Sequence, residues 1–320
     1  MSDHFKDKTV LVTGGSGFIG SHLTRKLLNL DARVHALVHE DSDLWRLRDI
    51  PEGAATIWRR NLEHAGPLSE CLQEIKPQLV FHAGALVNAE RNMALLRDMV
   101  QVNVMGSLNL VTALLDSNCE CFINFGTCEE YGNGEAPFLE NQRESPVSPY
   151  SSSKVAATHF CQMIHRATGF PVVTVRPFLT YGPGQTSDML IPSLIRQCLT
   201  GVKEYNMTAG EQTREFNYVS DIVDGVLGVA QRSDLVGEVV NIGNGQEHKI
   251  IEVAKLIVQL TDSSLKLNEG ALPYRPGEVF HFFSSTEKFA QSIKPSSFTS
   301  LKEGLENTIL WYNNFLKTSS

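Results

Sequence analysis

Short apolar runs alternate with longer amphipathic stretches through the first half of the chain. The runs predict five strands, at 9–12, 33–39, 56–58, 79–85 and 122–125. After the first run, Ile19, Leu23 and Leu27 recur at helical spacing, which predicts an amphipathic helix. This alternation continues up to Pro177 and predicts a parallel, doubly wound sheet.

The pattern changes after Pro177. We expect a turn at 181–185, a helix from 190–195, and a strand at 214–221 that ends at a helix cap. The apolar run 239–243 predicts a further strand that returns to the main sheet, and 275–278 predicts a loop.

No repeat, low-complexity linker or block of charge divides the chain. The predicted fold class is therefore α/β, with a doubly wound parallel Rossmann sheet and a smaller, interleaved C-terminal substrate lobe. We expect a dinucleotide-binding domain over 1–177, joined by the strand near 239–243, and the small lobe over 178–320.

Composition narrows the classes of partner. The 320 residues carry a formal net charge of -8, which argues against nucleic acid or an anionic membrane as the main partner. No apolar run reaches the roughly 18 residues of a membrane span, and the polar N-terminus is unlike a signal peptide. The six cysteines have no metal-ligand spacing. We expect reduced thiols, no metal and a cytoplasmic location.

Three glycines follow the first predicted strand. Gly14, Gly17 and Gly20 precede the amphipathic helix, and such glycines allow a tight turn and close approach of a pyrophosphate to the helix N-terminus. The alternative is a glycine-rich surface turn, which the placement between strand and helix disfavours.

The second strand has no carboxylate at its tip to hold the ribose hydroxyls of NAD. His39 and Arg46 could instead lie near the 2′-phosphate of NADP, which slightly favours NADP. Either residue is equally compatible with a solvated surface position.

Tyr150 and Lys154 are spaced by one helical turn, so they share one face of any helix that begins near Tyr150. A lysine ammonium beside a phenol lowers the pKa of tyrosine from about 10, which would let Tyr150 accept a proton. Thr127 follows the fifth predicted strand, at the sheet edge where open α/β sheets bind ligands.

Together these segments resemble the extended short-chain dehydrogenase/reductases of the nucleotide-sugar epimerase/dehydratase family. The resemblance rests on the glycine turn, Thr127-x-Glu129-x-Tyr131-Gly132, Tyr150-x-x-x-Lys154 and five further motifs: 82–85, 103–106, 181–185, 214–221 and 275–277. It implies a tightly bound NAD or NADP that is recycled within each turnover. It also implies that Tyr150 takes the proton of the sugar 4-hydroxyl, that Thr127 binds the same oxygen, that Lys154 holds the ribose, and that the protein is a homodimer.

The triplet Thr127-Cys128-Glu129 separates the subclasses. Family dehydratases carry threonine, then aspartate or serine, then glutamate here, and the form with cysteine is similar to the dehydratase of tunicamycin assembly. Glu129 would then remove the proton at carbon 5, and Cys128 would protonate the departing 6-hydroxyl. Cys128 is equally compatible with a small packed residue, and Glu130 is interpreted as a solvated or structural carboxylate.

The resemblance therefore implies a nucleotide-sugar dehydratase acting through transient oxidation at carbon 4. The alternatives are a 4-epimerase, an NADPH-dependent 4-keto sugar reductase and a UDP-glucuronate decarboxylase. The expected catalytic residues are Thr127, Cys128, Glu129, Tyr150 and Lys154, and the expected substrate-binding residues are Thr180, Gln185, Arg214 and Arg275. The expected cofactor-binding residues are Gly14, Ser16, Gly17, Phe18, Ile19, Gly20, His39, Asn61, Leu62, Ala83, Gly84, Ala85, Asn103, Tyr150, Lys154 and Pro177.

Overall fold

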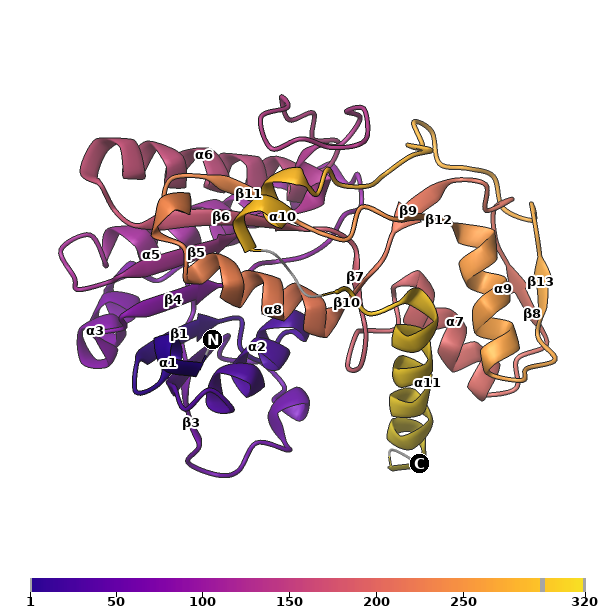
Figure 1. Ribbon diagram of the computed structural model, residues 1–320, viewed down its shortest axis with the longest axis horizontal. Coiled ribbons are helices and arrows are strands. Elements are labelled where there is room, and N and C mark those ends of the chain that lie inside the picture. Colours follow the sequence, from indigo (N-terminus) through magenta and orange to yellow (C-terminus); the bar gives the residue numbers. More distant parts are fainter. Residues whose placement is uncertain (1, 294–296, 319–320) are drawn as a thin grey trace.

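Seven parallel strands form the central sheet of the computed structural model, which describes residues 2–293 and 297–318 (Figure 1). Their order is β11-β6-β5-β4-β1-β2-β3. The direction of winding reverses between β1 and β4, so the crevice at their carboxyl ends is where such sheets bind ligands. The strands are β1 (Thr9–Thr13), β2 (Arg33–Val38), β3 (Ala55–Arg59), β4 (Leu79–His82), β5 (Cys121–Phe125), β6 (Val172–Pro177) and β11 (Val239–Ile242).

The predicted fold class is confirmed: the sheet is parallel and helices cover both of its faces. Strand β11 pairs with β6 along the edge of the sheet, although more than 60 residues separate them in the chain. The fourth strand is shorter than the predicted 79–85, because it ends at His82. Beyond it, the backbone of Gly84 approaches that of Gly14 so closely that a Cβ on Gly14 would lie 2.8 Å from Gly84 Cα.

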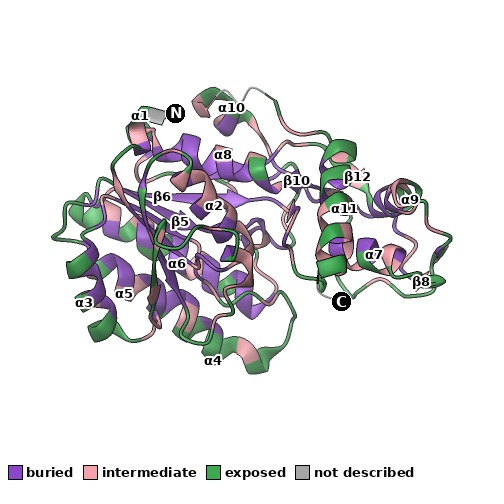
Figure 2. Cartoon of the chain, turned by 90° about the horizontal axis from the view of Figure 1, so that it is seen from below, coloured by how far each residue is buried: buried purple, intermediate pink, exposed green. Residues whose placement is uncertain are grey.

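Each face of the sheet carries its own apolar core, and Figure 2 colours the buried residues of the chain purple. Leu23 and Leu27 pack on one face with Val226 and Phe289, so α2, α8 and α10 cover it. Leu72, Leu110 and other apolar side chains of α3, α5 and α6 cover the opposite face. These helices are α2 (Phe18–Leu28), α3 (Ala65–Ile75), α5 (Gly106–Thr112), α6 (Pro149–Thr168), α8 (Val219–Ala230) and α10 (Glu287–Ile293).

The motif at 103–106 lies in a long helix with an irregular centre. It runs through α4 (Leu96–Met99), the π-helical η3 (Val100–Met105) and α5. Such π-helical segments loosen the regular hydrogen-bond ladder and often mark functional regions. Here η3 packs against α6, which carries Tyr150 and Lys154.

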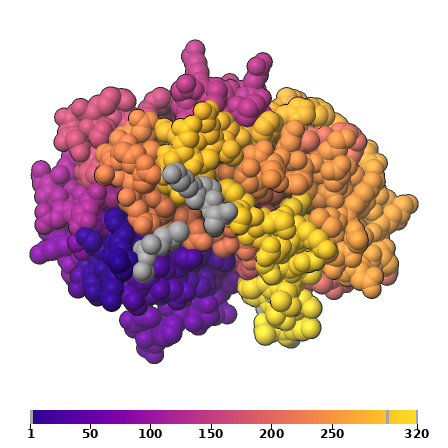
Figure 3. Space-filling view, in the orientation of Figure 1, coloured from indigo at the N-terminus to yellow at the C-terminus, as the bar shows by residue number. Residues whose placement is uncertain are grey.

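The smaller lobe lies to one side of the sheet and has a separate apolar core (Figure 1). Leu194, Val253 and Leu305 meet there, one from each of three helices. Its elements are α7 (Leu190–Leu199), α9 (Ile250–Leu260), α11 (Leu301–Thr318), β8 (Glu204–Asn206), β9 (Thr213–Glu215), β12 (Glu247–Lys249) and β13 (Lys266–Asn268). In Figure 3 the later part of the chain, orange to yellow, covers both parts of the molecule.

The strand predicted at 214–221 is wrong in its length and its ending. The chain forms β9 and then β10 (Asn217–Tyr218), which belong to different two-stranded sheets with β12 and β7 (Thr180–Tyr181). Phe216 separates these two strands, and its side chain is buried in the small-lobe core. Asp221 lies within the first turn of α8 and accepts hydrogen bonds from the backbone and hydroxyl of Thr299.

Short helical segments complete the described chain: α1 (Ser2–Phe5), η1 (Trp45–Leu47), η2 (Met93–Leu95), η4 (Cys128–Glu130) and η5 (Ser233–Leu235). Across residues 2–293 and 297–318, no helix is both long and apolar enough to cross a membrane. The six cysteines are free and buried. In the same residues, no three His, Cys, Asp or Glu side chains gather as a metal site would require.

Candidate active site

A cavity of about 790 Å³ opens along the carboxyl ends of the sheet and reaches the small lobe. Twenty of the sequence-predicted site residues line it: Gly14, Ser16, Gly17, Phe18, Ile19, Gly20, His39, Asn61, Leu62, Ala83, Gly84, Ala85, Thr127, Cys128, Glu129, Tyr150, Lys154, Pro177, Thr180 and Gln185. Three lie outside its lining: Asn103, Arg214 and Arg275.

The glycine turn leaves the N-terminus of α2 open to this cavity. Gly17 occupies the N-cap position without any side-chain cap, so the first amides of the helix face outward. A Cβ on Gly20 would overlap the Gly14 carbonyl oxygen, and Gly14 itself has a φ of 67°. An uncapped helix N-terminus attracts anions, so these residues fit the pyrophosphate of a dinucleotide.

Basic side chains gather at the other end of the dinucleotide crevice, where β2 and β3 end. Arg59 pairs with Val38 across the two strands, and the next residues, Arg60 and His39, both line the cavity. Arg46 lies close by, but its guanidinium already donates to the carbonyl oxygens of Gly184 (2.8 Å) and Ser16 (3.2 Å). The sequence pointed to His39 and Arg46 and missed Arg60, which becomes apparent only when β3 is placed beside β2.

Tyr150 and Lys154 lie one turn apart on helix α6, as the spacing predicted, and both line the cavity. Pro149 begins the helix and Ser148 caps it, with Ser148 and Ser151 forming a reciprocal capping box. Tyr150 and Lys154 are both largely buried, at 8% and 3% exposed. The cap fixes where the first turn begins and therefore where the Tyr150 phenol points.

The electrostatics of Tyr150 differ from the sequence expectation. Burial raises the pKa of the phenol above its ordinary value, and a hydrogen bond from the Thr127 hydroxyl opposes that rise. Burial also lowers the pKa of Lys154. The expected net lowering of the Tyr150 pKa is therefore not found, because removal from water dominates for both groups.

Thr127, Cys128 and Glu129 lie at the end of β5, where the chain turns into η4. Burial raises the pKa of the Glu129 carboxyl, while Arg214, Arg275 and Arg91 oppose that rise. A carboxylate with a raised pKa is a stronger base than an ordinary one. The carboxylate of Glu129 and the phenol of Tyr150 line the same cavity, so one bound molecule can meet both.

Cys128 lies beside an aromatic cluster with Tyr131, Phe138, Phe178 and Phe282. The residue is 3% exposed, and burial raises the pKa of its thiol well above the ordinary value. The thiol is therefore protonated at neutral pH. This position suits both readings of Cys128, because the residue packs against apolar neighbours and also lines the cavity.

Asn103 and His82 lie behind the cavity wall. Asn103 accepts from Leu86 N–H (2.8 Å) and donates to the Ser153 hydroxyl (2.9 Å), so it braces the loop after β4 against α6. His82 bonds to the hydroxyls of Thr13 and Ser107, and burial lowers its pKa to about 3. Asn103 therefore bridges two structural elements behind the cavity wall, and it does not line the space that a cofactor would occupy.

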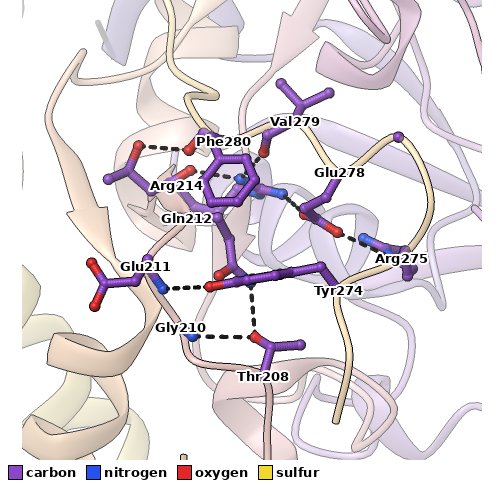
Figure 4. Close-up of polar contacts among 12 residues, drawn as sticks. Thr208, Gly210, Glu211, Gln212, Arg214, Tyr274, Arg275, Glu278, Val279 and Phe280 are labelled. Atoms are coloured by element: carbon purple, nitrogen blue, oxygen red, sulfur yellow. Dashed lines mark hydrogen bonds and ion pairs between the residues drawn. The ribbon is translucent and has the colours of Figure 1, made fainter. Parts of the chain in front are cut away.

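The two predicted substrate arginines lie together in the small lobe, with Glu278 between them (Figure 4). Arg214 also donates to the carbonyl oxygens of Thr213 and Val279, and its side chain is only 14% exposed. Arg275 is 76% exposed. The guanidinium of Arg275 is therefore free to turn towards an anion, whereas Arg214 is held in place.

Arg91, from the loop after β4, reaches across to the small lobe. It donates to the carbonyl oxygens of Pro276 (2.7 Å) and Gly277 (3.3 Å), next to Arg275. Sequence reasoning missed it, because nothing in its local pattern marks a contact 185 residues away.

The model of the NAD-dependent epimerase/dehydratase family matches residues 10–243. The chain belongs to this family. A human dTDP-D-glucose 4,6-dehydratase is 31% identical over 95% of this chain and 90% of its own length.

Two solved structures show how the family divides. UDP-glucuronic acid 4-epimerase from Bacillus cereus, in complex with UDP-glucuronic acid and NAD, matches with a TM-score of 0.87 and 27% identity, covering 96% of this chain and 99% of that one. TunA, an NAD-dependent NDP-hexosamine 5,6-dehydratase of tunicamycin biosynthesis, matches with a TM-score of 0.83 and 28% identity, covering 95% of this chain and 97% of its own. The chain is thus similar to epimerases and dehydratases alike.

Proposed function

We propose that this family member is a nucleotide-sugar dehydratase that oxidises carbon 4 transiently and removes the proton of carbon 5. The observation that carries the proposal is Glu129. It shares the cavity with Tyr150, and burial holds its pKa above the ordinary value. A simple epimerase has no need of a second base at this place.

In the proposed reaction, the Tyr150 phenolate takes the proton of the 4-hydroxyl while the Thr127 hydroxyl binds the same oxygen. A nicotinamide dinucleotide held by the glycine turn and Lys154 would supply a hydride acceptor for carbon 4 and a donor for the later return of that hydride, and its positive charge would lower the pKa of Tyr150. The new ketone acidifies carbon 5, whose proton passes to Glu129. The bond from carbon 6 to oxygen then breaks, and the Cys128 thiol protonates the departing hydroxide to give water.

The small lobe would supply the diphosphate handle. A guanidinium fork matches phosphate oxygens, and Arg275 has the exposure needed to reach them. Thr180 and Gln185 line the cavity on the way from that lobe to Tyr150. Arg214, which ion-pairs with Glu278, would keep the loop of Arg275 in position.

The test is a panel of UDP-, dTDP-, GDP- and CDP-sugars incubated in deuterated water and followed by NMR. Deuterium at carbon 5, or loss of the 6-hydroxyl, supports the dehydratase. Inversion at carbon 4 without solvent deuterium contradicts it. Glu129→Gln should abolish elimination and preserve hydride transfer, while Glu135→Gln, at an exposed acid outside the cavity, serves as the matched control.

A 4-epimerase is the second candidate, since the chain resembles epimerase structures as closely as it resembles dehydratases. In that case Glu129 would not touch the reacting carbons. Unchanged 4-epimerisation by Glu129→Gln would favour this reading.

We further propose that the tightly held cofactor is NADP in preference to NAD. The support is the lack of a carboxylate at position 39 and the presence of Arg60 beside His39. Mass spectrometry of the cofactor released from denatured protein tests this, and release of NAD alone would contradict it.

A homodimer is also proposed, formed through α4, η3 and α6. These neighbouring elements expose apolar side chains: Leu96 (48% exposed), Val100 (43%), Phe160 (40%) and Met163 (45%). Sedimentation should show a dimer that Phe160→Asp dissociates and that Leu310→Asp, at an exposed leucine on α11, leaves intact. The free thiols fit the expected cytoplasmic location.

A further inference from the structure

Glu130 is a fully buried carboxylate directly after Glu129. One oxygen accepts the backbone N–H of Thr127 at 2.8 Å. The other accepts the Thr158 hydroxyl at 3.0 Å and two donors of Arg176, Nε at 3.0 Å and Nη2 at 2.7 Å. The sequence left open whether Glu130 is solvated, and its burial excludes that.

The chain makes room for this carboxylate. A Cβ at Gly126 would overlap a carboxylate oxygen of Glu130, so the glycine before Thr127 is required for the contact. Arg176, also fully buried, balances the charge and binds Glu144 as well (2.7 Å). Removing one partner of such a pair leaves an uncompensated buried charge, so the arrangement is held firmly.

Glu130 contacts one residue of the proposed reaction and a near neighbour of another. It holds the backbone of Thr127, and it binds Thr158, which follows Lys154 by one turn of α6. Within residues 2–293 and 297–318, the Lys154 ammonium makes no hydrogen bond or ion pair of its own. A buried ammonium without an opposite charge nearby tends to lose its proton.

We propose that Glu130 is a positioning residue that fixes Thr127 and the turn of α6 next to Lys154, and that it supplies the negative charge of this part of the site. The inference rests on the proposed oxidation at carbon 4, but it is indifferent to whether elimination or epimerisation follows. Glu130 touches neither substrate nor cofactor in this scheme and acts through its neighbours.

Of the titratable groups that face Lys154 in the described part of the chain, only Glu130 is charged at neutral pH. Lys154 is faced by Glu130, by Cys161 and by His82. Burial raises the pKa of Cys161 to about 12 and lowers that of His82 to about 3, so both are neutral at pH 7. Against the lowering caused by burial, the carboxylate of Glu130 raises the pKa of Lys154.

The same carboxylate acts on Tyr150. Beyond burial, Cys128, Glu129 and Glu130 all raise the pKa of the phenol. We therefore expect replacement of Glu130 by glutamine to lower the pKa of both Tyr150 and Lys154. The acid limb of the pH profile, set by deprotonation of Tyr150, and the alkaline limb, set by deprotonation of Lys154, should both move to lower pH.

The test compares Glu130→Gln with Glu144→Gln in the enzyme purified with its cofactor. Each variant removes one carboxylate from Arg176, but only Glu130 contacts Thr127 and Thr158. The measurements are the pH dependence of cofactor reduction by the active nucleotide sugar, and the NMR titration of carbon-13-labelled tyrosine, with Tyr150 assigned by Tyr150→Phe. The second measurement needs no substrate.

For Glu130→Gln we expect both limbs and the Tyr150 titration at lower pH, kcat several-fold lower at the alkaline end, and KM within about twofold of wild type. Glu144→Gln should leave the limbs in place. Equal displacement in both variants, or in neither, would overturn the inference. If none of the nucleotide sugars leads the wild-type enzyme to reduce its cofactor, the proposed function fails. The inference then fails with it, even if the Tyr150 titration moves.

A second variant, Glu130→Asp, keeps the inference testable if Glu130→Gln does not fold. Glu130→Asp keeps the charge but withdraws it from Thr127, so kcat should fall while both limbs stay in place. A displaced profile in Glu130→Asp would contradict the inference as well.

Discussion

The guanidinium of Arg46 donates to the carbonyl oxygen of Gly184 at 2.8 Å, which joins the loop after β2 to the turn after β7. The same side chain lies over the ring of Trp45, with 4.2 Å from the guanidinium carbon to the ring centroid. Trp45 in turn packs against Trp311 and Phe315 of α11. The last helix of the chain thereby holds the first loops around the cofactor end of the cavity.

Trp311→Ala should therefore loosen the cofactor. The change removes an aromatic contact to Trp45 and frees Arg46 to leave the Ser16 carbonyl. We expect the variant to retain less nicotinamide cofactor after gel filtration. Its free energy of unfolding should be about 1–3 kcal/mol lower than that of wild type.

The matched control is Leu310→Ala on the same helix, because Leu310 is 60% exposed. That variant should lie within about 0.5 kcal/mol of wild type and keep its cofactor. Equal cofactor retention by both variants would show that α11 has no part in holding it.

The features of this fold that could be predicted from the sequence are those that depend on neighbouring residues. The strand β1 and the glycines of the turn follow from neighbouring residues, and they were predicted correctly. The end of β4 at His82 depends on Gly84 meeting Gly14, and the break at Phe216 depends on packing in the small lobe. Neither cause is local, so neither boundary could be predicted.

Gly20→Ala should disrupt the cofactor turn. Its new methyl group would overlap the Gly14 carbonyl oxygen, so the helix must move away from the strand. We expect a loss of about 1–3 kcal/mol in unfolding free energy, together with weaker binding of the cofactor.

The control for Gly20 is Gly66→Ala, in the first turn of α3, where a Cβ meets nothing within 4 Å. That change should stabilise the protein by about 0.4–1 kcal/mol through the unfolded state. Chemical denaturation of the two variants measures both effects, and equal losses would contradict the packing explanation.

His82 should make the stability depend on pH. Burial lowers its pKa in the folded protein from 6.5 to about 3, so the unfolded chain binds a proton that the folded one rejects. Stability is therefore complete above pH 6.5 and falls as the pH drops, by about 2 kcal/mol between pH 6.5 and 5. Denaturation of wild type and His82→Gln at both pH values measures it, and an equal decline in the variant would exclude His82 as the cause.

The candidate site divides in the same way as the fold. Tyr150 and Lys154 are spaced along one helix, so local sequence places them together. Glu130, Arg60 and Arg91 matter through contacts with residues far away in the chain, such as Arg176 and Gly277. Only the folded structure brings these contacts about.

The two substrate arginines should respond differently to alanine. Arg275 is 76% exposed, so Arg275→Ala should raise KM about 10- to 100-fold, the worth of a charge-assisted bond to phosphate, without changing the melting temperature. Arg214→Ala should raise KM and also destabilise the fold, because it leaves the Glu278 carboxylate, 7% exposed, without a main partner. Arg166→Ala, an exposed residue at the end of α6, is the control. Equal melting temperatures for all three would contradict the distinction.

Cys128 should lose more than packing when it is changed to alanine. Cys128 lines the cavity, and burial raises the pKa of its thiol. The thiol is therefore protonated at neutral pH, but it is a weak acid. For a general acid of this kind we expect Cys128→Ala to slow elimination about 100-fold, the lower end of the usual range, and to preserve hydride transfer. Cys71→Ala, a buried thiol of α3 in a different apolar core and outside the cavity lining, matches the loss of volume. If both variants lose similar stability and neither slows elimination, Cys128 is only a packed residue, and the proton for the departing hydroxide must come from elsewhere in the cavity.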